Sequence, residues 1–268
     1  MRFPLDGVSR FAQRAFMFDL LPPLTLALAF AIAFGAGTVK GVVGFAMPMI
    51  LVSGLSSIMA PEIALAAFLL PTLVTNVWQA MRQGWQAAAR SVRAFRVFLL
   101  AGGIALLLAA QLVPVLSHQV LLLMIGVTVM FFAAAQLLGW RPRLARRSAR
   151  IDAAIGAFTG TLGGLSGIWG PPTVAYLTAL DTPKEDQMRV QGTIYGLGAV
   201  LLVGAHLQSG VLAPALIPLS LAMVVPAMAG MWLGLQLQDR IDQALFRRIT
   251  LIVLLIAAAN LVRRGLVG

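Results

Sequence analysis

The sequence contains no cysteine, which excludes a disulfide framework, a thiolate metal site and a cysteine nucleophile. Charge is also scarce, because Asp, Glu, Lys and Arg make up 11% of the 268 residues whereas hydrophobic residues make up 60%. This ratio excludes a water-soluble domain. The two histidines lie far apart without clustered carboxylates, and no GxxxxGK[ST] motif occurs. We therefore expect no metal, no cofactor and no ATP hydrolysis in this chain.

The apolar residues that dominate the sequence are grouped into blocks of about 15 to 23, close to the ~20 residues that a helix needs to cross a bilayer. Period-two alternation is absent, which favours helices over a barrel. The net charge of +11 comes from arginines in short breaks between the blocks, without interleaved aromatic residues. That pattern indicates membrane topology and not nucleic-acid binding. The predicted apolar segments are 22–36, 41–57, 62–80, 95–113, 118–138, 151–168, 170–180, 190–208, 213–235 and 248–262.

Two glycine-rich breaks in these blocks resemble each other. GTVKGVVGFAMPM (37–49) aligns without gaps to GTLGGLSGIWGPP (160–172). Glycine motifs also recur by chance in membrane helices, because glycine permits close packing, but a break in each copy favours an internal repeat. Broken or re-entrant helices have this form. The identical pairs are Gly37/Gly160, Thr38/Thr161, Gly41/Gly164, Gly44/Gly167 and Pro48/Pro171.

The repeat divides the chain into an N-terminal tail (1–19), a first transmembrane repeat (20–138), a basic cytoplasmic linker (139–150) and a second transmembrane repeat (151–268). The fold class is thus an all-α polytopic membrane protein. We expect an inverted repeat of two halves, each with a broken or re-entrant helix hairpin plus three transmembrane helices. The preferred count is about six full crossings with two re-entrant helices, and about eight to ten crossings is the alternative.

The orientation follows from the positions of Lys and Arg. Segments 81–96, 139–150, 181–189 and 236–247 hold most of these residues, so the positive-inside rule places all four in the cytoplasm. An odd number of crossings then separates the two repeats, and they face opposite ways. Secondary transporters commonly have this inverted architecture.

Lys40 lies in the middle of the apolar stretch 22–57, and no acidic residue is near it in the sequence. A lysine at membrane depth costs about 3 kcal/mol on insertion scales, so it snorkels, pairs or serves a site. Two half-helix N-termini are expected just after the breaks, near 41–44 and 164–167, where unpaired N–H groups favour an anion. These donors and Lys40 predict an anion site. The alternative is a lysine that snorkels from a break nearer the surface.

Uncharged polar residues extend this predicted site. Segment 62–80 carries Thr72, Thr75, Asn76 and Gln79 on one helical face, and segment 190–208 adds Gln191, Thr193 and Tyr195. Such side chains can bind the oxygen atoms of an anion or only hydrogen-bond to neighbouring helices. The residues expected to bind substrate are Lys40, Thr38, Gly41, Gly44, Asn76, Gln79, Thr161, Gly164, Ser166 and Gly167.

The stretches GAGTVKGVVGFAMPMI (35–50) and GAFTGTLGGLSGIWGPPTVAYL (156–177) resemble the sulfite exporter TauE/SafE family of membrane permeases, as does the two-halved hydropathy. The resemblance implies a multi-pass protein of the bacterial inner membrane that moves a small organosulfur or other oxyanion, such as sulfite, sulfoacetate or a related sulfonate or carboxylate. The paired breaks of the family map onto 37–48 and 163–172. Lys40 aligns with Gly163, so the site is not symmetric.

The partners expected are the small anionic substrate and the lipid bilayer, with no nucleic acid. A coupling proton or ion is left open, since the candidate proton carriers Glu62, Asp152, His118 and His206 are more often anchors or caps. A homo-oligomer is also left open, because small-residue faces pack equally well within and between protomers.

The enzymatic alternative is an intramembrane serine hydrolase, with Ser166 as nucleophile and His206 as its base. Ser166 occupies the repeat position of Val43, so the hairpin alone explains its surroundings. No catalytic residue is therefore expected.

Overall fold

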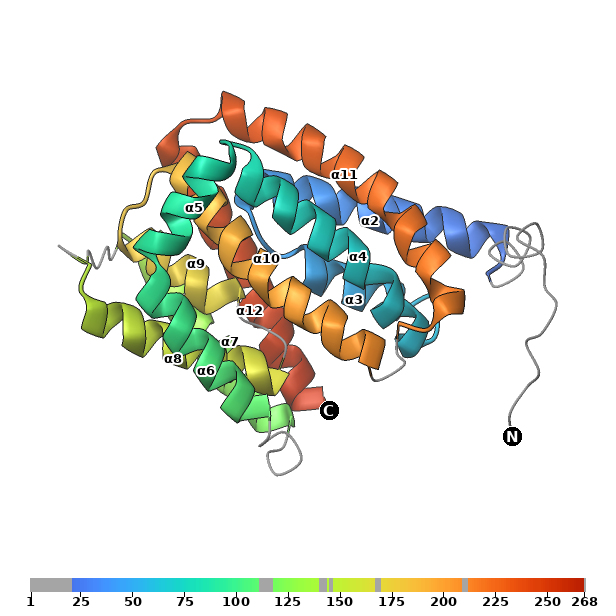
Figure 1. Cartoon of the computed structure of the whole chain (residues 1–268), viewed down its shortest axis with the longest axis horizontal. Helices are drawn as coiled ribbons and strands as arrows, with labels where there is room; N and C mark the ends of the chain where they lie inside the picture. Colours follow the sequence, from blue (N-terminus) through green and yellow to red (C-terminus); the bar gives the residue numbers. More distant parts are fainter. Residues whose placement is uncertain are drawn as a thin grey trace.

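The computed structural model describes residues 21–110, 118–139, 144, 147–166, 170–208 and 212–267, so the expected tail 1–19 lies outside it. Regular structure in the described residues is helical, which confirms the predicted class (Figure 1). The helices are α2 (Pro23–Val43), α3 (Met47–Leu55), α4 (Pro61–Met81), α5 (Trp85–Ala94), α6 (Arg96–Ala110), α7 (His118–Leu137), α8 (Ala149–Ser166), α9 (Gly170–Ala179), α10 (Lys184–Gln208), the 3-10 turn η1 (Pro214–Leu216), α11 (Ile217–Arg240) and α12 (Gln243–Val267).

Among the described residues, fewer helices qualify as membrane spans than the preferred count of crossings. Within the described residues, four helices are long and apolar enough to cross a bilayer, namely α2, α4, α11 and α12. A fifth span results if α5 and α6, bent by 72° at their junction, are taken together. Helix α10 is as long as these, but its first turns are charged and polar residues recur along its length. The chain is nevertheless a multi-pass membrane protein.

The first break lies later in the chain than predicted. Helix α2 continues through Gly37 and Gly41 and ends at Val43, where Gly44 adopts a left-handed conformation (φ 87°). The N–H of Gly44 donates to the carbonyl of Lys40 (2.7 Å), which closes the helix in the manner of a glycine C-cap. Helix α3 begins at Met47. The expected break at 37–48 is thus shorter and shifted, because its first glycines serve helix packing.

Those glycines allow helices from different halves to pack backbone against backbone. A Cβ on Gly37 would lie 2.1 Å from the carbonyl oxygen of Ala227 on α11. A Cβ on Gly160 of α8 would lie 2.0 Å from the carbonyl oxygen of Gly102 on α6. Such approach is possible only where no side chain intervenes. The helix pairs α2–α11 and α6–α8 therefore depend on glycine.

The arginine-rich segment 81–96, expected to be a loop, contains helix α5. Its buried side is made of small residues, Ala87, Ala88 and Ser91, whereas Arg90 and Arg93 are exposed. A polar helix that lies along a membrane surface has a low mean hydropathy, so the apolar pattern alone does not distinguish it from a loop.

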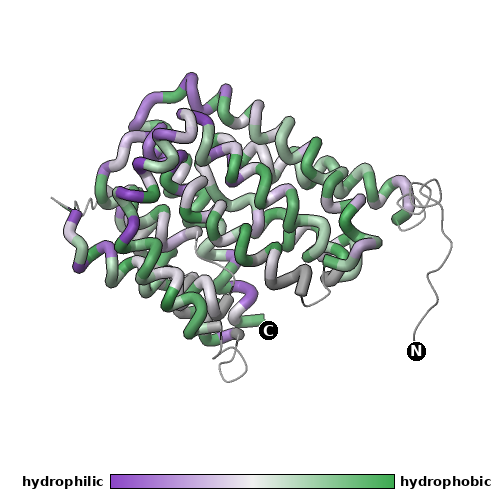
Figure 2. The backbone as a smooth tube through the Cα atoms, in the orientation of Figure 1, coloured by the Kyte–Doolittle hydropathy of each residue, from purple (hydrophilic) through white to green (hydrophobic). Residues whose placement is uncertain are grey.

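The described residues of the four segments 81–96, 139–150, 181–189 and 236–247 lie at one end of the helix bundle, the arginine-rich end, where Figure 2 shows hydrophilic residues gathered. Arg82 at the end of α4 forms an ion pair with Asp239 at the end of α11. Arg189 of α10 donates from Nε to the hydroxyl of Ser91 on α5 (2.8 Å). These contacts agree with the predicted grouping of the four segments on one side of the membrane.

An ion pair between the exposed Arg147 and the buried Asp152 joins the linker 139–150 to this end. Arg147 Nη2 lies 2.5 Å from Asp152 Oδ2, and the hydroxyl of Tyr176 donates to Asp152 Oδ1 (2.5 Å). Arg147 also donates to the carbonyl of Ala94 (2.8 Å) and lies over the ring of Phe95. Because Asp152 is fully engaged in these contacts, it acts as a structural anchor between α8, α9 and the α5–α6 bend.

Candidate functional site

Lys40 is the centre of the candidate site. It lies in the last turn of α2, and its side chain is 1% exposed. Its Nζ donates to the side-chain oxygen of Asn76 on α4. Among the described residues Lys40 forms no salt bridge. The alternative that Lys40 snorkels to the surface is therefore wrong, because the ammonium group points into the protein and binds a neutral amide.

The polar face predicted on α4 is buried, as expected for residues that share one side of a helix. Thr72, Thr75, Asn76 and Gln79 are each 5% exposed or less. The Thr75 hydroxyl donates to the carbonyl of Pro71 in its own helix (2.6 Å). Thr72 Oγ1 and Gln79 Oε1 have no hydrogen-bond partner within the described part of the chain. These two oxygen atoms lack a partner, and Lys40 carries a charge that no acidic group among the described residues offsets.

Two glutamine side chains close the C-terminal end of α2. Gln79 Nε2 donates to the carbonyls of Gly44 (3.1 Å) and Met188 (2.8 Å). The amide of Gln191, oriented so that its oxygen accepts from Gln187 (3.2 Å), donates to Gly44 O as well (2.9 Å). A helix end presents unpaired carbonyls, and these amides satisfy them. The Nε2 of Gln79 thus bonds to neighbouring segments, and a role of Gln79 in substrate binding stays a prediction.

No helix begins at 41–44, or at 164–166 in the described part of the second break, where N-termini were expected. Gly41 lies in the last turns of α2, Gly44 is its C-cap, and Gly164 lies in the last turn of α8, so their free backbone groups are carbonyls. The helices that follow begin at Met47 and Gly170. The displacement arises because α2 and α8 extend through glycines that pack against other helices.

The start of α9 nevertheless lies next to the first break. A Cβ on Gly170, the first residue of α9, would lie 3.9 Å from the Phe45 ring in the first break. The hydroxyl of Tyr195 on α10 donates to the carbonyl of Gly170 (3.1 Å). The start of α9 is thus held beside the end of α2, as the prediction of a shared site requires.

Other predicted site residues are not brought to Lys40. Thr38 donates to the carbonyl of Phe34 (2.9 Å), and its backbone lies against Gly230 and Gly234 of α11. Gly41 also packs on α11. Thr38 and Gly41 therefore serve the α2–α11 contact, since they lie on a different face of α2 from Lys40.

The second half contributes less to the described site than predicted. Thr161 and Gly164 lie in the last turns of α8, and no hydrogen bond between them and Lys40 occurs within the described residues. The side chain of Ser166 and all of Gly167 lie outside the described residues, as does the side chain of His206.

Sequence reasoning missed the contact of α4 with α10. A Cβ on Gly192 would lie 2.5 Å from the backbone nitrogen of Ala80, and a Cβ on Gly196 would lie 3.8 Å from the Cβ of Asn76. The signal was present, because Gly192 and Gly196 are spaced by one helical turn and share a face. This contact places α10 directly behind the Lys40–Asn76 pair.

Several membrane-spanning helices around a buried cation and paired helix breaks define a multi-pass helical transport protein. The family model described as "Sulfite exporter TauE/SafE" matches residues 29–261, and the chain belongs to this family. It is a membrane transporter and not an enzyme, so the serine hydrolase alternative is wrong. Comparison with curated proteins and with solved structures gives no match.

Proposed function

We propose that this chain is a secondary transporter that moves a small oxyanion across the bacterial inner membrane, with Lys40 as the cation that binds it. Sulfite, sulfoacetate and related sulfonates or carboxylates are the substrates proposed. The observation that carries the proposal is the buried Lys40, whose contact in the described residues is the neutral Asn76.

A neutral amide satisfies one donor of the ammonium group but leaves its charge uncompensated. Burial of an unpaired charge is costly, and the cost falls when a counter-ion enters. An ammonium group has three donors, so donors beyond the one used by Asn76 can bind an oxyanion. The Thr72 hydroxyl, one turn before Asn76, is a further donor with no partner in the described residues. An oxyanion between these groups would satisfy both.

We further propose that the two halves form an inverted repeat. Helix α2 starts at one end of the bundle and α8 starts at the other, so the two hairpins fold back in opposite directions (Figure 1). The end of α3 returns to the first half of α2, since a Cβ on Gly54 would lie 2.8 Å from the Ile32 side chain. The end of α9 returns to the start of α8, where Tyr176 donates to Asp152. That opposition supports the inversion.

The packing of helices between the halves also supports an inverted repeat. Helix α2 of the first half packs on α11 of the second, and the corresponding α8 of the second half packs on α6 of the first. Gly37 and Gly160 are aligned positions of the repeat, and each faces the backbone of the partner helix. A two-fold relation between the halves would produce this exchange of partners.

We propose that the arginine-rich end of the bundle faces the cytoplasm, which can be tested by labelling single cysteines in this cysteine-free chain. Gln86 of α5 is exposed at the arginine-rich end, and Ser56, after α3, is exposed on the side where α3 ends. In intact spheroplasts, a membrane-impermeant maleimide is expected to label Ser56→Cys. Gln86→Cys should react only after permeabilisation. The reverse labelling would invert the topology, and labelling of both from outside would contradict their placement at opposite ends.

The anion site is tested by thermal unfolding of the purified protein with sulfite, sulfate, thiosulfate, sulfoacetate, taurine or matched carboxylates. A ligand that binds only the folded state raises the melting temperature, and the rise grows with the logarithm of its concentration above the dissociation constant. We expect stabilisation by one class of oxyanion, and its loss in Lys40→Met. Equal stabilisation of wild type and Lys40→Met would remove Lys40 from the site. Stabilisation by neutral or cationic solutes alone would contradict the proposed anion specificity.

A further inference from the structure

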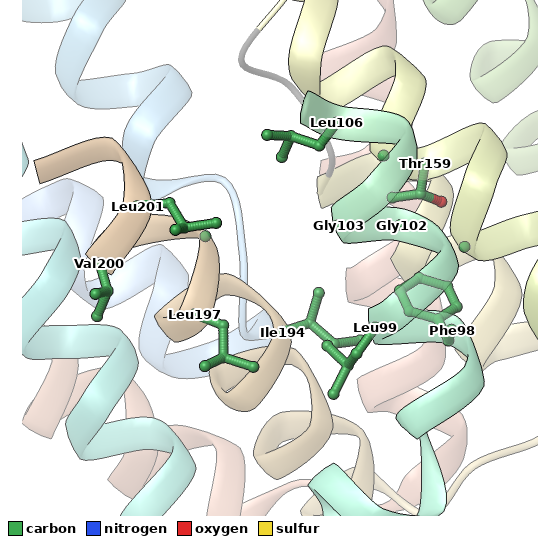
Figure 3. Close-up of a pocket in the computed structure, with 13 residues that line it drawn as sticks. Phe98, Leu99, Gly102, Gly103, Leu106, Thr159, Ile194, Leu197, Val200 and Leu201 are labelled. Carbon is green, nitrogen blue, oxygen red and sulfur yellow. The ribbon is translucent and has the colours of Figure 1, made fainter. Parts of the chain in front are cut away.

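An apolar groove lies between α6, α8 and α10, away from the Lys40 site. Its volume is about 320 Å³. Figure 3 shows Leu197 and Leu201 of α10 on one wall and Leu99 and Leu106 of α6 on the other, with Thr159 of α8 near the second wall. Leu197 is 47% exposed and Leu201 is 53% exposed, so the groove opens sideways from the bundle.

The surface beside the groove is apolar and exposed. Leu100, Ile104 and Leu107 on the outer side of α6 are each at least 60% exposed, and Val200 of α10 is 55% exposed. In a membrane-spanning chain such side chains contact lipid, because hydrocarbon is the solvent at that depth. The groove therefore opens toward acyl chains.

Glycine creates the space in the groove. A Cβ built on Gly103 of α6 would find no atom within 4 Å. The wall from Leu99 to Leu106 extends about 10 Å along the helix, from a rise of 1.5 Å per residue. An α-helix with its side chains is about 10–12 Å wide and does not fit into a cavity of this volume. A single extended hydrocarbon chain does.

A positively charged side chain, Arg96, lies toward one end of the groove. Arg96 lies on the same face of α6 as Leu99, Gly103 and Leu106, one turn before Leu99. It is exposed and forms no hydrogen bond or ion pair within the described residues. Arginine binds phosphate oxygens with two parallel hydrogen bonds, so a phosphate at this position would find a matching donor.

The groups around Arg96 leave this end positively charged. Arg147 reaches the carbonyl of Ala94, two residues before Arg96. Asp152, the carboxylate that Arg147 binds, is already neutralised by this pair and accepts a hydrogen bond from Tyr176. The excess charge of the cluster thus resides on Arg96.

We propose that the groove binds an anionic phospholipid of the adjacent leaflet, with one acyl chain between α6 and α10 and the phosphate on Arg96. This lipid site depends only on the membrane-spanning fold, and it does not depend on which anion the protein transports. The bound lipid would fix the position of α6, in the first half of the chain, relative to α10, in the second half.

The test is native mass spectrometry of the protein in detergent with equal amounts of phosphatidylglycerol and phosphatidylcholine that carry the same acyl chains. Both lipids carry the phosphate, but the choline cation of phosphatidylcholine cancels its charge and is repelled by Arg96, so wild type is expected to retain phosphatidylglycerol with a preference of about tenfold. Gly103→Leu fills the groove and should reduce binding of both lipids. Gly35→Leu, at an equally open glycine of α2, should bind as wild type does.

A second pair of variants, one at Arg96 and one control at Arg90, tests the headgroup contact. Arg96→Gln should bring the two lipids to equal occupancy, whereas Arg90→Gln, which removes the same charge from the exposed side of α5, should keep the preference. A preference retained in Arg96→Gln, or equal binding by Gly103→Leu and Gly35→Leu, would overturn the proposal. A dimer of wild type that Gly103→Leu abolishes would identify a second copy of the chain as the occupant instead.

A photoreactive phosphatidylglycerol with a diazirine in its acyl chain tests the site without any variant. Cross-links on peptides that contain 97–106 or 194–201 would support the groove. Cross-links confined to other helices would contradict it.

Discussion

Replacement of Lys40 by methionine is expected to reduce transport of sulfite into proteoliposomes by about 10- to 150-fold at low substrate concentration, the loss that corresponds to one hydrogen bond to a charged group. Methionine has a similar length and fills the same buried space without a charge. The barrier to anion entry then rises because the ammonium group no longer offsets the lost hydration of the substrate. Initial rates over a range of sulfite concentrations measure the effect.

Two controls separate this loss from misfolding. Lys184→Met removes a lysine whose Nζ donates to the carbonyls of Gln238 and Ile241 at the arginine-rich end, far from the proposed path. Transport by that variant should be retained. The double variant Lys40→Met, Asn76→Leu also removes the Asn76 amide that Lys40→Met leaves without its partner, so it should be folded and inactive. Wild-type rates in Lys40→Met would show that the buried charge has no role in transport.

The helical class was predictable because lipid leaves the backbone few options. Apolar blocks of sufficient length between arginine-rich breaks mark α4, α11 and α12 directly. Helix α5 was not found, since its small buried residues and exposed arginines produce no apolar block. Hydropathy detects helices that cross the membrane, and it is insensitive to helices that lie along its surface.

The positions of the breaks were harder to predict because glycine has two uses in this chain. Gly37 and Gly41 lie inside α2 and permit contact with α11, whereas Gly44 terminates the helix with a positive φ. All three look alike in the sequence. Ala46 also has a positive φ (74°), which no residue preference indicates. Helix contacts between distant segments decide which glycine ends a helix.

The site was predicted in part. The face of α4 placed Asn76 near the first break, and the structure brings it to Lys40. The capping role of Gln79 and Gln191 could not be predicted, because it requires the end of α2 to lie between α4 and α10. A polar stripe shows that a face is buried, but the partner that it binds depends on tertiary packing.

Substitution of the glycines that pack between the halves is expected to reduce the stability of the protein strongly. Gly37→Ala would place a methyl group 2.1 Å from the carbonyl oxygen of Ala227, and Gly160→Ala would place one 2.0 Å from that of Gly102. Backbone atoms on two helices cannot rotate away as a side chain does. We expect each variant to lose about 1–3 kcal/mol or more of unfolding free energy, the cost typical of overpacking.

The matched controls should change stability in the opposite direction. At Gly35 of α2 and Gly103 of α6 an added methyl group would have no atom within 4 Å, and both glycines lie in the same helix pairs as Gly37 and Gly160. Alanine is preferred over glycine inside a helix by about 1 kcal/mol, so Gly35→Ala and Gly103→Ala should be neutral or stabilising. Denaturant unfolding in detergent micelles measures all four variants. If Gly37→Ala and Gly160→Ala were as stable as the controls, the close approach of α2 to α11 and of α8 to α6 would be refuted. A large loss in only one of the two would argue against equivalent roles of these glycines in the two halves, and so against the inverted repeat.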